Sequence, residues 1–281
     1  MNSENIRSNR KKYIKSAIVL LIVIVLLLFC NFQNKHLETT HYTYETEQLG
    51  VDLDGYRIVQ ISDLHNAKFG KNNQKLVDRI RECAPDMIVL TGDLVDSNHT
   101  NVDRVVQFVD EIVKICPVYY VTGNHEYWLD TSEYEKLMDG LVSAGVVILD
   151  NQVVEISRGD AKFRLVGLDD KSLADGTLEA LLSDEKELTV VLAHEPQYFA
   201  RYAGTGVDLV LSGHAHGGQF RLPFVGGIVA PDQGFLPEYT AGEYYMNGTE
   251  MIVSRGLGNS VIPVRLFNYP EIVCVDLVGK H

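Results

Sequence analysis

Cysteine is scarce in this 281-residue chain, which contains four: Cys30, Cys83, Cys116 and Cys274. Cys30 lies inside a long apolar run, so three remain for the rest of the chain, and an odd number cannot complete a disulfide framework. None of them has the CxxC spacing of a zinc knuckle. We therefore expect them to be small core residues.

Basic residues are also scarce beyond the N-terminus. The first 15 residues carry five basic side chains and one acidic side chain, which leaves 20 basic against 37 acidic residues in the remainder. A body with this charge repels phosphate backbones at long range, so we expect no nucleic-acid partner. Repeats and low-complexity tracts are missing outside the apolar run. With 46% hydrophobic and 22% charged residues, the composition is that of a globular domain with an N-terminal appendage.

The N-terminal apolar run is long enough to cross a bilayer as a helix if its flanks contribute. Ala17–Phe29 contains no polar residue. The basic residues before it predict a cytoplasmic N-terminus and an exported body. We expect an uncleaved signal anchor over residues 16–32.

Other interpretations of this run remain open. A cleaved signal peptide, which would make the body a secreted protein, needs small residues at its processing site, and residues 29–32 offer none of that kind. Residues 9–15 are similar to a twin-arginine export signal whose second arginine is replaced by lysine. A buried core helix is the remaining alternative, but the run is not amphipathic.

Alternating apolar strands and helices follow the anchor. Helical spacing over residues 72–83 and 102–113 separates three apolar runs, a rhythm that predicts right-handed crossovers and a parallel sheet. A third helix is expected over residues 133–141. Beyond Gly145, short runs at 146–149, 152–157 and 162–166 suggest antiparallel pairing.

Polar side chains follow five of the apolar runs at the point where each strand should end. In Met87–Asp93, for example, Gly92 allows a sharp turn that leaves Asp93 at the carboxyl end of the strand, where open α/β sheets bind ligands. The five runs with this kind of ending are Arg57–His65, Met87–Asp93, Val118–Glu126, Leu188–Glu195 and Asp208–His216. A single Asp-x-His or Gly-Asp is usually a loop, but five in order indicate one site.

This ordered set resembles the calcineurin-like metallophosphoesterase family over roughly residues 51–277. Residues 216–219, 230–234 and 254–258 look like the YkuE/YaeI-type bacterial branch of that family. The resemblance implies an α/β (α+β) fold, a four-layer αββα sandwich, preceded here by one transmembrane helix. The expected division is a cytoplasmic basic segment (1–15), the anchor (16–32), a linker with one edge strand (33–50) and a catalytic domain (51–281).

The resemblance also implies two metal sites that share Asp93. The first is formed by Asp63, His65, Asp93 and His216, and the second by Asp93, Asn124, His194 and His214. Mixed oxygen and imidazole ligands suit two divalent transition ions, Mn, Fe, Zn or Co, better than Mg or Ca. Such a pair activates a shared hydroxide for attack on phosphorus. His125 would then stabilise charge or protonate the leaving oxygen.

Several residues near these ligands are candidates for supporting roles. Asp96 and Glu126 are expected to orient ligands or cap helices, and Glu195 has no clear role. Gly217 and Gly218 form either a phosphate-binding nest or a tight turn. Candidates for gripping substrate are Arg221, Arg255 and Arg265, each with a surface ion pair as the alternative, and candidates for lining the cleft are Phe69, Tyr127 and Trp128, each with core packing as the alternative.

The predicted function is therefore a membrane-anchored phosphoesterase whose catalytic domain lies outside the cytoplasmic membrane. Location favours a phosphodiester or pyrophosphate substrate, either lipid-linked or derived from the envelope, and a phosphomonoester stays open. The alternative is a non-catalytic metal-binding scaffold that binds partners. The oligomeric state and the residues that bind substrate are not specified by the sequence.

Overall fold

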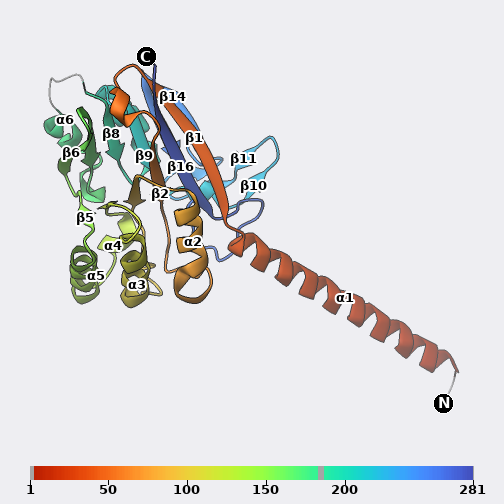
Figure 1. Ribbon diagram of the computed structural model, residues 1–281. Coiled ribbons are helices and arrows are strands. Elements are labelled where there is room, and N and C mark those ends of the chain that lie inside the picture. The colour runs from red at the N-terminus through yellow and green to blue at the C-terminus, as the bar shows by residue number, and fades with distance from the viewer. Residues whose placement is uncertain (1–2, 183–186, 281) are drawn as a thin grey trace.

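The computed structural model describes residues 3–182 and 187–280 (Figure 1). The longer helices are α1 (Ser3–Lys35), α2 (Gln74–Glu82), α3 (Val102–Ile112), α5 (Thr131–Ala144), α6 (Thr177–Leu181) and α7 (Phe199–Gly204), with one short turn, α4 (Asn124–Tyr127). Two six-stranded sheets form the centre of the molecule.

The first sheet has the order β1-β16-β2-β3-β4-β5. Its strands are β1 (Glu38–Thr46), β2 (Tyr56–Ile61), β3 (Met87–Thr91), β4 (Val118–Val121), β5 (Val147–Ile148) and β16 (Glu271–Gly279). Strands β2 to β5 are parallel, as the alternation with α2 and α3 predicts. The expectation that residues 146–149 pair antiparallel is wrong: β5 pairs parallel with β4, because α5 carries the chain back across the sheet before β5 begins.

The second sheet has the order β14-β15-β9-β8-β7-β6. Its strands are β6 (Gln152–Arg158), β7 (Ala161–Gly167), β8 (Thr189–Leu192), β9 (Leu209–Ser212), β14 (Gly242–Met246) and β15 (Thr249–Val253). The hairpin β6–β7 is antiparallel, as its Gly-Asp turn suggests, and β7, β8, β9 and β15 are parallel. Two small hairpins follow β9: β10 (Arg221–Leu222) with β11 (Gly226–Gly227), and β12 (Val229–Ala230) with β13 (Gly234–Phe235).

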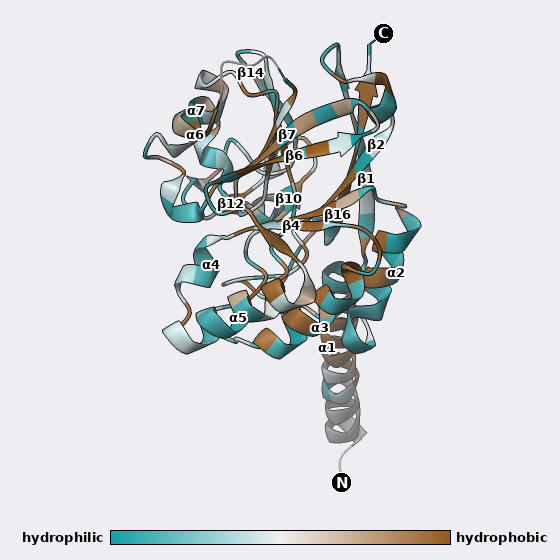
Figure 2. Cartoon of the chain, turned by 60° about the vertical axis from the view of Figure 1, so that its left-hand side comes forward, coloured by the Kyte–Doolittle hydropathy of each residue, from teal (hydrophilic) through white to brown (hydrophobic). Residues whose placement is uncertain are grey.

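The sheets pack face to face, and helices cover their outer faces. Residues such as Val89, Val190 and Val275 fill the space between the sheets. Leu76, Val105 and Leu141 bring α2, α3 and α5 against the outer face of the first sheet, and α6 and α7 cover the second sheet. Figure 2 shows brown strands inside and teal on the outward faces of α2 and α5. The expected four-layer αββα sandwich is confirmed.

The segment expected to link anchor and domain contains the predicted edge strand. Strand β1 pairs in parallel with β16 along nine residues. Tyr42 and Tyr44 pack against the core between the sheets, while Thr43 and Glu45 are exposed, so the period-two pattern of this polar stretch suits an edge strand. The partner strand lies more than 200 residues away in the sequence, which is why the sequence alone did not assign the pairing.

Helix α1 projects from the body (Figure 1). Within residues 12–35, an 18-residue stretch has a mean hydropathy of 2.8 and no residue buried by the rest of the chain, so this helix is long and apolar enough to cross a membrane. Signal sequences have the same character. Its last turns contact residues 263–269: Asn34 Nδ2 donates to Pro263 O (2.8 Å), and the His36 and Tyr269 rings are 4.8 Å apart.

Candidate metal centre

The strand ends bring the polar motifs together along one edge of the two sheets. Asp63 follows β2, Asp93 follows β3, His194 follows β8 and His214 follows β9. Asp63, Asp93 and His214 adopt left-handed backbone conformations, with φ between 50° and 63°. Non-glycine residues rarely adopt this conformation, and they do so most often at functional sites. The turns aim the side chains across the gap between the sheets.

The first cluster contains Asp63, His65, Asp93 and His216, whose ligand atoms lie within 4.8 Å of one another. His65 Nε2 lies 3.2 Å from His216 Nε2 and 3.4 Å from Asp93 Oδ2, and His216 Nε2 lies 3.6 Å from Asp63 Oδ1. Four ligand atoms from three strand ends therefore converge on one point.

The second cluster contains Asp93, His194 and His214, and Asn124 lies beside it. His194 Nε2 lies 3.4 Å from Asp93 Oδ2 and 3.2 Å from Asn124 Oδ1, and His214 Nδ1 lies 3.0 Å from Asn124 Oδ1. Asp93 belongs to both clusters, as the sequence resemblance implied.

The protonation of the histidines suits metal binding. His194 Nδ1 lies 2.7 Å from Thr91 O, and His214 Nε2 lies 2.9 Å from the carboxylate of Asp232. Because a carbonyl and a carboxylate accept, these outer nitrogens carry hydrogen, and the inner nitrogens, His194 Nε2 and His214 Nδ1, face the cluster. Second hydrogen bonds of this kind typically fix metal-binding imidazoles. Asp232, on the β12–β13 turn, was not singled out as a site residue, although it lies in the 230–234 stretch that resembles the YkuE/YaeI-type branch.

Burial also affects the charge states. His65, His194 and His216 are almost fully buried. Burial lowers the pKa of His65 to about 3 and that of His216 well below its ordinary value, so both are neutral imidazoles. Burial alone would raise the pKa of Asp93, but the charge of His194 outweighs it and holds the pKa well below the usual range. Burial alone would lower the pKa of His194, but the charge of Asp93 raises it well above its ordinary value, so His194 holds a proton that a divalent ion would replace. Two neutral imidazoles beside an ionised carboxylate are donors that divalent transition ions prefer.

The residues present therefore fit two metal ions. In the first cluster, the Nε2 atoms of His65 and His216 are buried and face each other at 3.2 Å. Buried polar groups are normally satisfied, and two imidazole lone pairs facing each other are favourable only around a shared cation or proton. The side chains able to hold the ions are the seven that the sequence resemblance implied.

Glu126 holds the loop that carries Asp93. Its Oε2 accepts from Asp93 N (2.9 Å) and Gly123 N (2.8 Å), and its Oε1 accepts from Leu94 N (2.8 Å) and, more weakly, from Val95 N (3.4 Å). Burial and the charge of Asp93 raise the pKa of Glu126 to about 8, although the backbone donors partly counter that rise. Four N–H groups aimed at two oxygens match a carboxylate, and Glu126 thus has the orienting role expected of it.

His125 lies beside both clusters without belonging to either. Ser97 N donates to His125 Nδ1 (3.2 Å), which makes Nδ1 the acceptor and leaves the proton on Nε2, 3.1 Å from Ser260 Oγ. Asp96 Oδ1 is 4.0 Å from Nδ1. The ring is packed between His65 and Trp128, with centroids 4.5 and 4.6 Å away. An imidazole held with an N–H outward can donate a proton or a hydrogen bond.

Glycine is required where the loops after β3 and β4 approach each other and His194. At Gly92, φ is 86°, and a Cβ would lie 2.5 Å from His194 Nδ1 and 2.8 Å from the backbone of Gly123. At Gly123 a Cβ would collide with the Asp93 carboxylate. Both positions therefore need glycine for the clusters to form.

The three candidate arginines have structural partners. Arg265 is fully buried and donates to Arg255 O (2.8 Å) and to the side chain of Asn259 (3.1 Å). Arg255 forms ion pairs with Glu38 and Glu271, and Arg221 donates to Gly217 O (2.9 Å). Their guanidinium groups hold loops together, so the expectation that they grip substrate is not supported. The sequence does not reveal such partners.

The aromatic residues expected near the cleft and the glycine pair at 217–218 differ in their surroundings. Phe69 belongs to the core, and Tyr127 donates to Asp169 (2.6 Å), whereas Trp128 is exposed and contacts His125. Gly218 N donates to Ala215 O (2.7 Å), the bond of a tight turn rather than of an anion nest.

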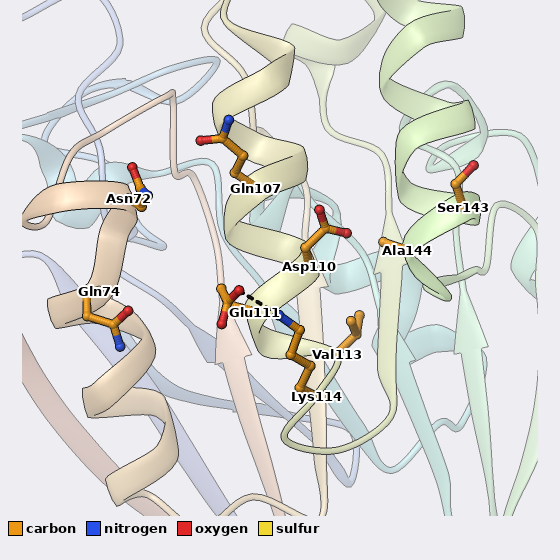
Figure 3. Close-up of a pocket in the computed structure, with 9 residues that line it drawn as sticks. All are labelled: Asn72, Gln74, Gln107, Asp110, Glu111, Val113, Lys114, Ser143 and Ala144. Atoms are coloured by element: carbon orange, nitrogen blue, oxygen red, sulfur yellow. Dashed lines mark hydrogen bonds and ion pairs between the residues drawn. The ribbon is translucent and has the colours of Figure 1, made fainter.

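A groove of about 550 Å³ lies away from the strand-end clusters, across α2, α3 and α5 (Figure 3). Its walls are polar side chains such as Gln107 and Asp110 and the Glu111–Lys114 ion pair (2.6 Å). None of the clustered histidines lines it. The groove therefore offers no comparable chemistry, and the strand-end clusters are the candidate site.

Comparison with known proteins agrees with this site. The family model of the calcineurin-like phosphoesterases matches residues 56–218. The chain is 32% identical to the uncharacterized metallophosphoesterase YkuE of Bacillus subtilis (strain 168), over 87% of each chain. It is 31% identical to the phosphodiesterase YaeI of Escherichia coli (strain K12), over 79% of this chain and 82% of that protein. It is also 29% identical to a transmembrane protein with metallophosphoesterase domain from Danio rerio, over 82% of this chain and 55% of that protein.

The matched segment contains all seven converging ligand residues and His125, and it covers more than half of the chain. The YkuE/YaeI resemblance noted in the sequence is confirmed by these relatives. The chain belongs to the calcineurin-like phosphoesterase family.

Proposed function

We propose that this protein is a membrane-anchored phosphoesterase that uses two divalent transition ions, Mn, Fe, Zn or Co. Asp63, His65, Asp93 and His216 would hold one ion, and Asp93, Asn124, His194 and His214 the other. The observation that carries the proposal is the convergence of buried imidazole and carboxylate atoms on Asp93. Bound there, two ions supply an activated water and a clamp for phosphoryl oxygens.

The chain's own groups have complementary tasks. Glu126 fixes the backbone at Asp93 through its N–H bonds. His125 carries its proton on Nε2, 3.1 Å from Ser260 Oγ, and it would donate to a phosphoryl oxygen or protonate the leaving group. Ser97 holds the tautomer that makes this possible. Positioned proton donors typically contribute about 10²–10⁴-fold to rate.

The membrane anchor is the second part of the proposal. The apolar helix α1 and the basic residues before it support a single-pass protein with a cytoplasmic N-terminus and an extracytoplasmic body. The transmembrane relative from Danio rerio agrees with a membrane location. Substrates in this position are phosphodiesters or pyrophosphates that are lipid-linked or derived from the envelope. Comparing the mass of the mature protein with that of the full chain distinguishes an anchored protein from a cleaved, secreted one.

Turnover of bis-p-nitrophenyl phosphate by the full chain with Mn²⁺ tests the enzymatic part. Asp93→Ala removes the shared ligand and should abolish turnover and lower the bound metal. Asp103→Ala is the matched control, because its exposed carboxylate forms a surface ion pair with Lys136 (2.9 Å) and should leave both unchanged. Bound metal without turnover under any divalent ion would instead support the non-catalytic scaffold.

A further inference from the structure

A second groove, of about 250 Å³, opens directly beside the first metal cluster. Its walls are almost entirely apolar and are formed by Val229, Ala230, Pro231, Val261 and Ile262. Ligand pockets are usually apolar, with a few polar groups that fix orientation. We call this feature the apolar groove.

The apolar groove ends at the candidate catalytic groups. His216, a member of the first cluster, lines it, as does Ser260, whose Oγ lies 3.1 Å from His125 Nε2. A molecule whose phosphate sits at the clusters would therefore direct one substituent into the apolar groove.

Besides His216 and Ser260, one more polar side chain lines the groove, and its amide already donates hydrogen bonds. Gln219 Nε2 donates to Ile262 O (2.8 Å) and to Val264 O (2.7 Å). Burying a sugar or a base against such walls would leave its polar groups unsatisfied, which is costly. The chemistry of the walls therefore selects a hydrocarbon substituent.

The loops around the apolar groove expose large apolar side chains to solvent. These are Phe224 at the tip of the β10–β11 hairpin, Phe235 and Leu236 on the β12–β13 hairpin, Val261, and Phe267. Phe224 and Val261 are almost completely exposed. Exposed apolar groups gathered in one region mark a protein or membrane contact. We call these five residues the apolar rim.

Backbone hydrogen bonds hold the segments of the apolar rim together. Ile228 N donates to Phe220 O (2.9 Å), Leu236 N donates to Ile228 O (2.9 Å), and Arg221 N donates to Leu266 O (2.9 Å). The two hairpins and the segment around residue 266 thus form one connected surface.

The apolar rim is fixed to the end of the membrane helix. Phe267 N donates to Gln33 Oε1 (3.0 Å), Arg265 N donates to Asn34 Oδ1 (2.9 Å), and the rings of Phe29 and Phe267 are 6.2 Å apart. Figure 1 shows hairpin β10–β11 on the side of the body from which α1 departs. A bilayer that contains α1 would lie next to the apolar rim.

We propose that the apolar groove binds the hydrocarbon chain of a membrane lipid whose phosphate ester lies at the clusters, with the apolar rim resting on the bilayer that supplies it. This inference rests on the proposed phosphoesterase function and narrows its substrate to phosphate esters of lipids. Hydrolysis would break the bond between phosphorus and the leaving oxygen, with water supplying the hydroxyl group on phosphorus and the proton on that oxygen.

Calorimetric binding of alkylphosphonates to the Mn²⁺-loaded full chain in lipid nanodiscs tests the proposal. Their carbon–phosphorus bond resists hydrolysis, so binding is read without turnover. Each buried methylene should tighten binding roughly fourfold until the groove is filled, so octylphosphonate should bind more than tenfold tighter than butylphosphonate. Val261→Asp places a charge at the groove and should reduce this gain to below threefold.

Val51→Asp is the matched control, because Val51 is exposed on the short turn before β2 and does not line the groove. This variant should keep the wild-type increase in affinity from butylphosphonate to octylphosphonate. Partition of the ligands into nanodisc lipid affects every variant equally. Equal affinities for the two chain lengths in the wild type, or an unchanged increase in affinity with chain length in Val261→Asp, would overturn the inference.

If bis-p-nitrophenyl phosphate is still hydrolysed in that case, the proposed function stands. A chain-length gain with bound Mn²⁺ but no hydrolysis would support the groove and refute the phosphoesterase.

Discussion

Replacing Glu126 by glutamine tests whether this buried side chain holds the metal centre as a carboxylate. The glutamine has the same shape but only one acceptor oxygen, so its NH₂ group must face one of the two pairs of backbone N–H groups. The less damaging orientation faces Leu94 N and Val95 N, because the Val95 bond is already long at 3.4 Å. The hydrogen bond from Leu94 N and the weaker one from Val95 N are then lost.

An orphaned buried donor costs about 1–3 kcal/mol, and hydrogen bonds to charged groups are stronger than neutral ones. We therefore expect Glu126→Gln to lower the free energy of unfolding by about 2–4 kcal/mol. For a body of this size, that corresponds to a fall in the melting temperature of roughly 4–16 °C.

The assay is thermal unfolding of the full chain in detergent, followed by the fluorescence of Trp128, the single tryptophan of the chain. Bound metal is measured on the same sample and should also fall, because Asp93 N loses rigid support. Glu155→Gln is the control, since Glu155 forms an exposed ion pair with Lys162 (2.9 Å) and surface pairs contribute little. An unchanged melting temperature in Glu126→Gln would show that Glu126 is already protonated, and the hydrogen-bond argument would be refuted.

Three further predictions concern catalysis, packing and pH. His125→Ala should reduce turnover of bis-p-nitrophenyl phosphate by about 10²–10⁴-fold while both ions stay bound; loss of metal from this variant, measured by elemental analysis, would show that His125 has been given the wrong role. Gly92→Ala should lower metal content and turnover because its Cβ would collide with His194. Gly55→Ala is the control, since Gly55 has a similar φ of 74° but open space around it, and both metal content and turnover should stay unchanged. Equal losses in the two variants would show that the positive φ of Gly92, and not the contact with His194, is what requires glycine. Burial raises the pKa of Glu250 to about 7 from an ordinary value of 4.5, so the folded state holds this proton more tightly than the unfolded state and stability falls as the pH rises between those values. Glu250→Gln should therefore gain in melting temperature relative to wild type at pH 8 but not at pH 4, and a difference independent of pH would contradict this.

The metal-binding residues could be anticipated from the sequence because the fold places them by regular geometry. Parallel strands end at a common edge, so the side chains that follow β2, β3, β8 and β9 meet wherever the two sheets pack together. The helices α2 and α3 were predictable for a similar reason, since their apolar spacing must face a sheet.

Contacts made by irregular segments could not be anticipated in this way. Asp232 and Ser260 reach His214 and His125 from turns that follow no periodic pattern. Arg265 resembled an anion-binding residue in the sequence, but its partners are the Asn259 side chain and backbone carbonyl groups that only the folded chain brings near. The pairing of β1 with β16 depends on strands at opposite ends of the chain.

Anomalous scattering from crystals of the Mn²⁺-loaded full chain tests the metal centre most directly. The account predicts two peaks, one among Asp63, His65 and His216 and one among Asn124, His194 and His214, with the carboxylate of Asp93 between them. A single peak, or peaks that do not share Asp93, would contradict it.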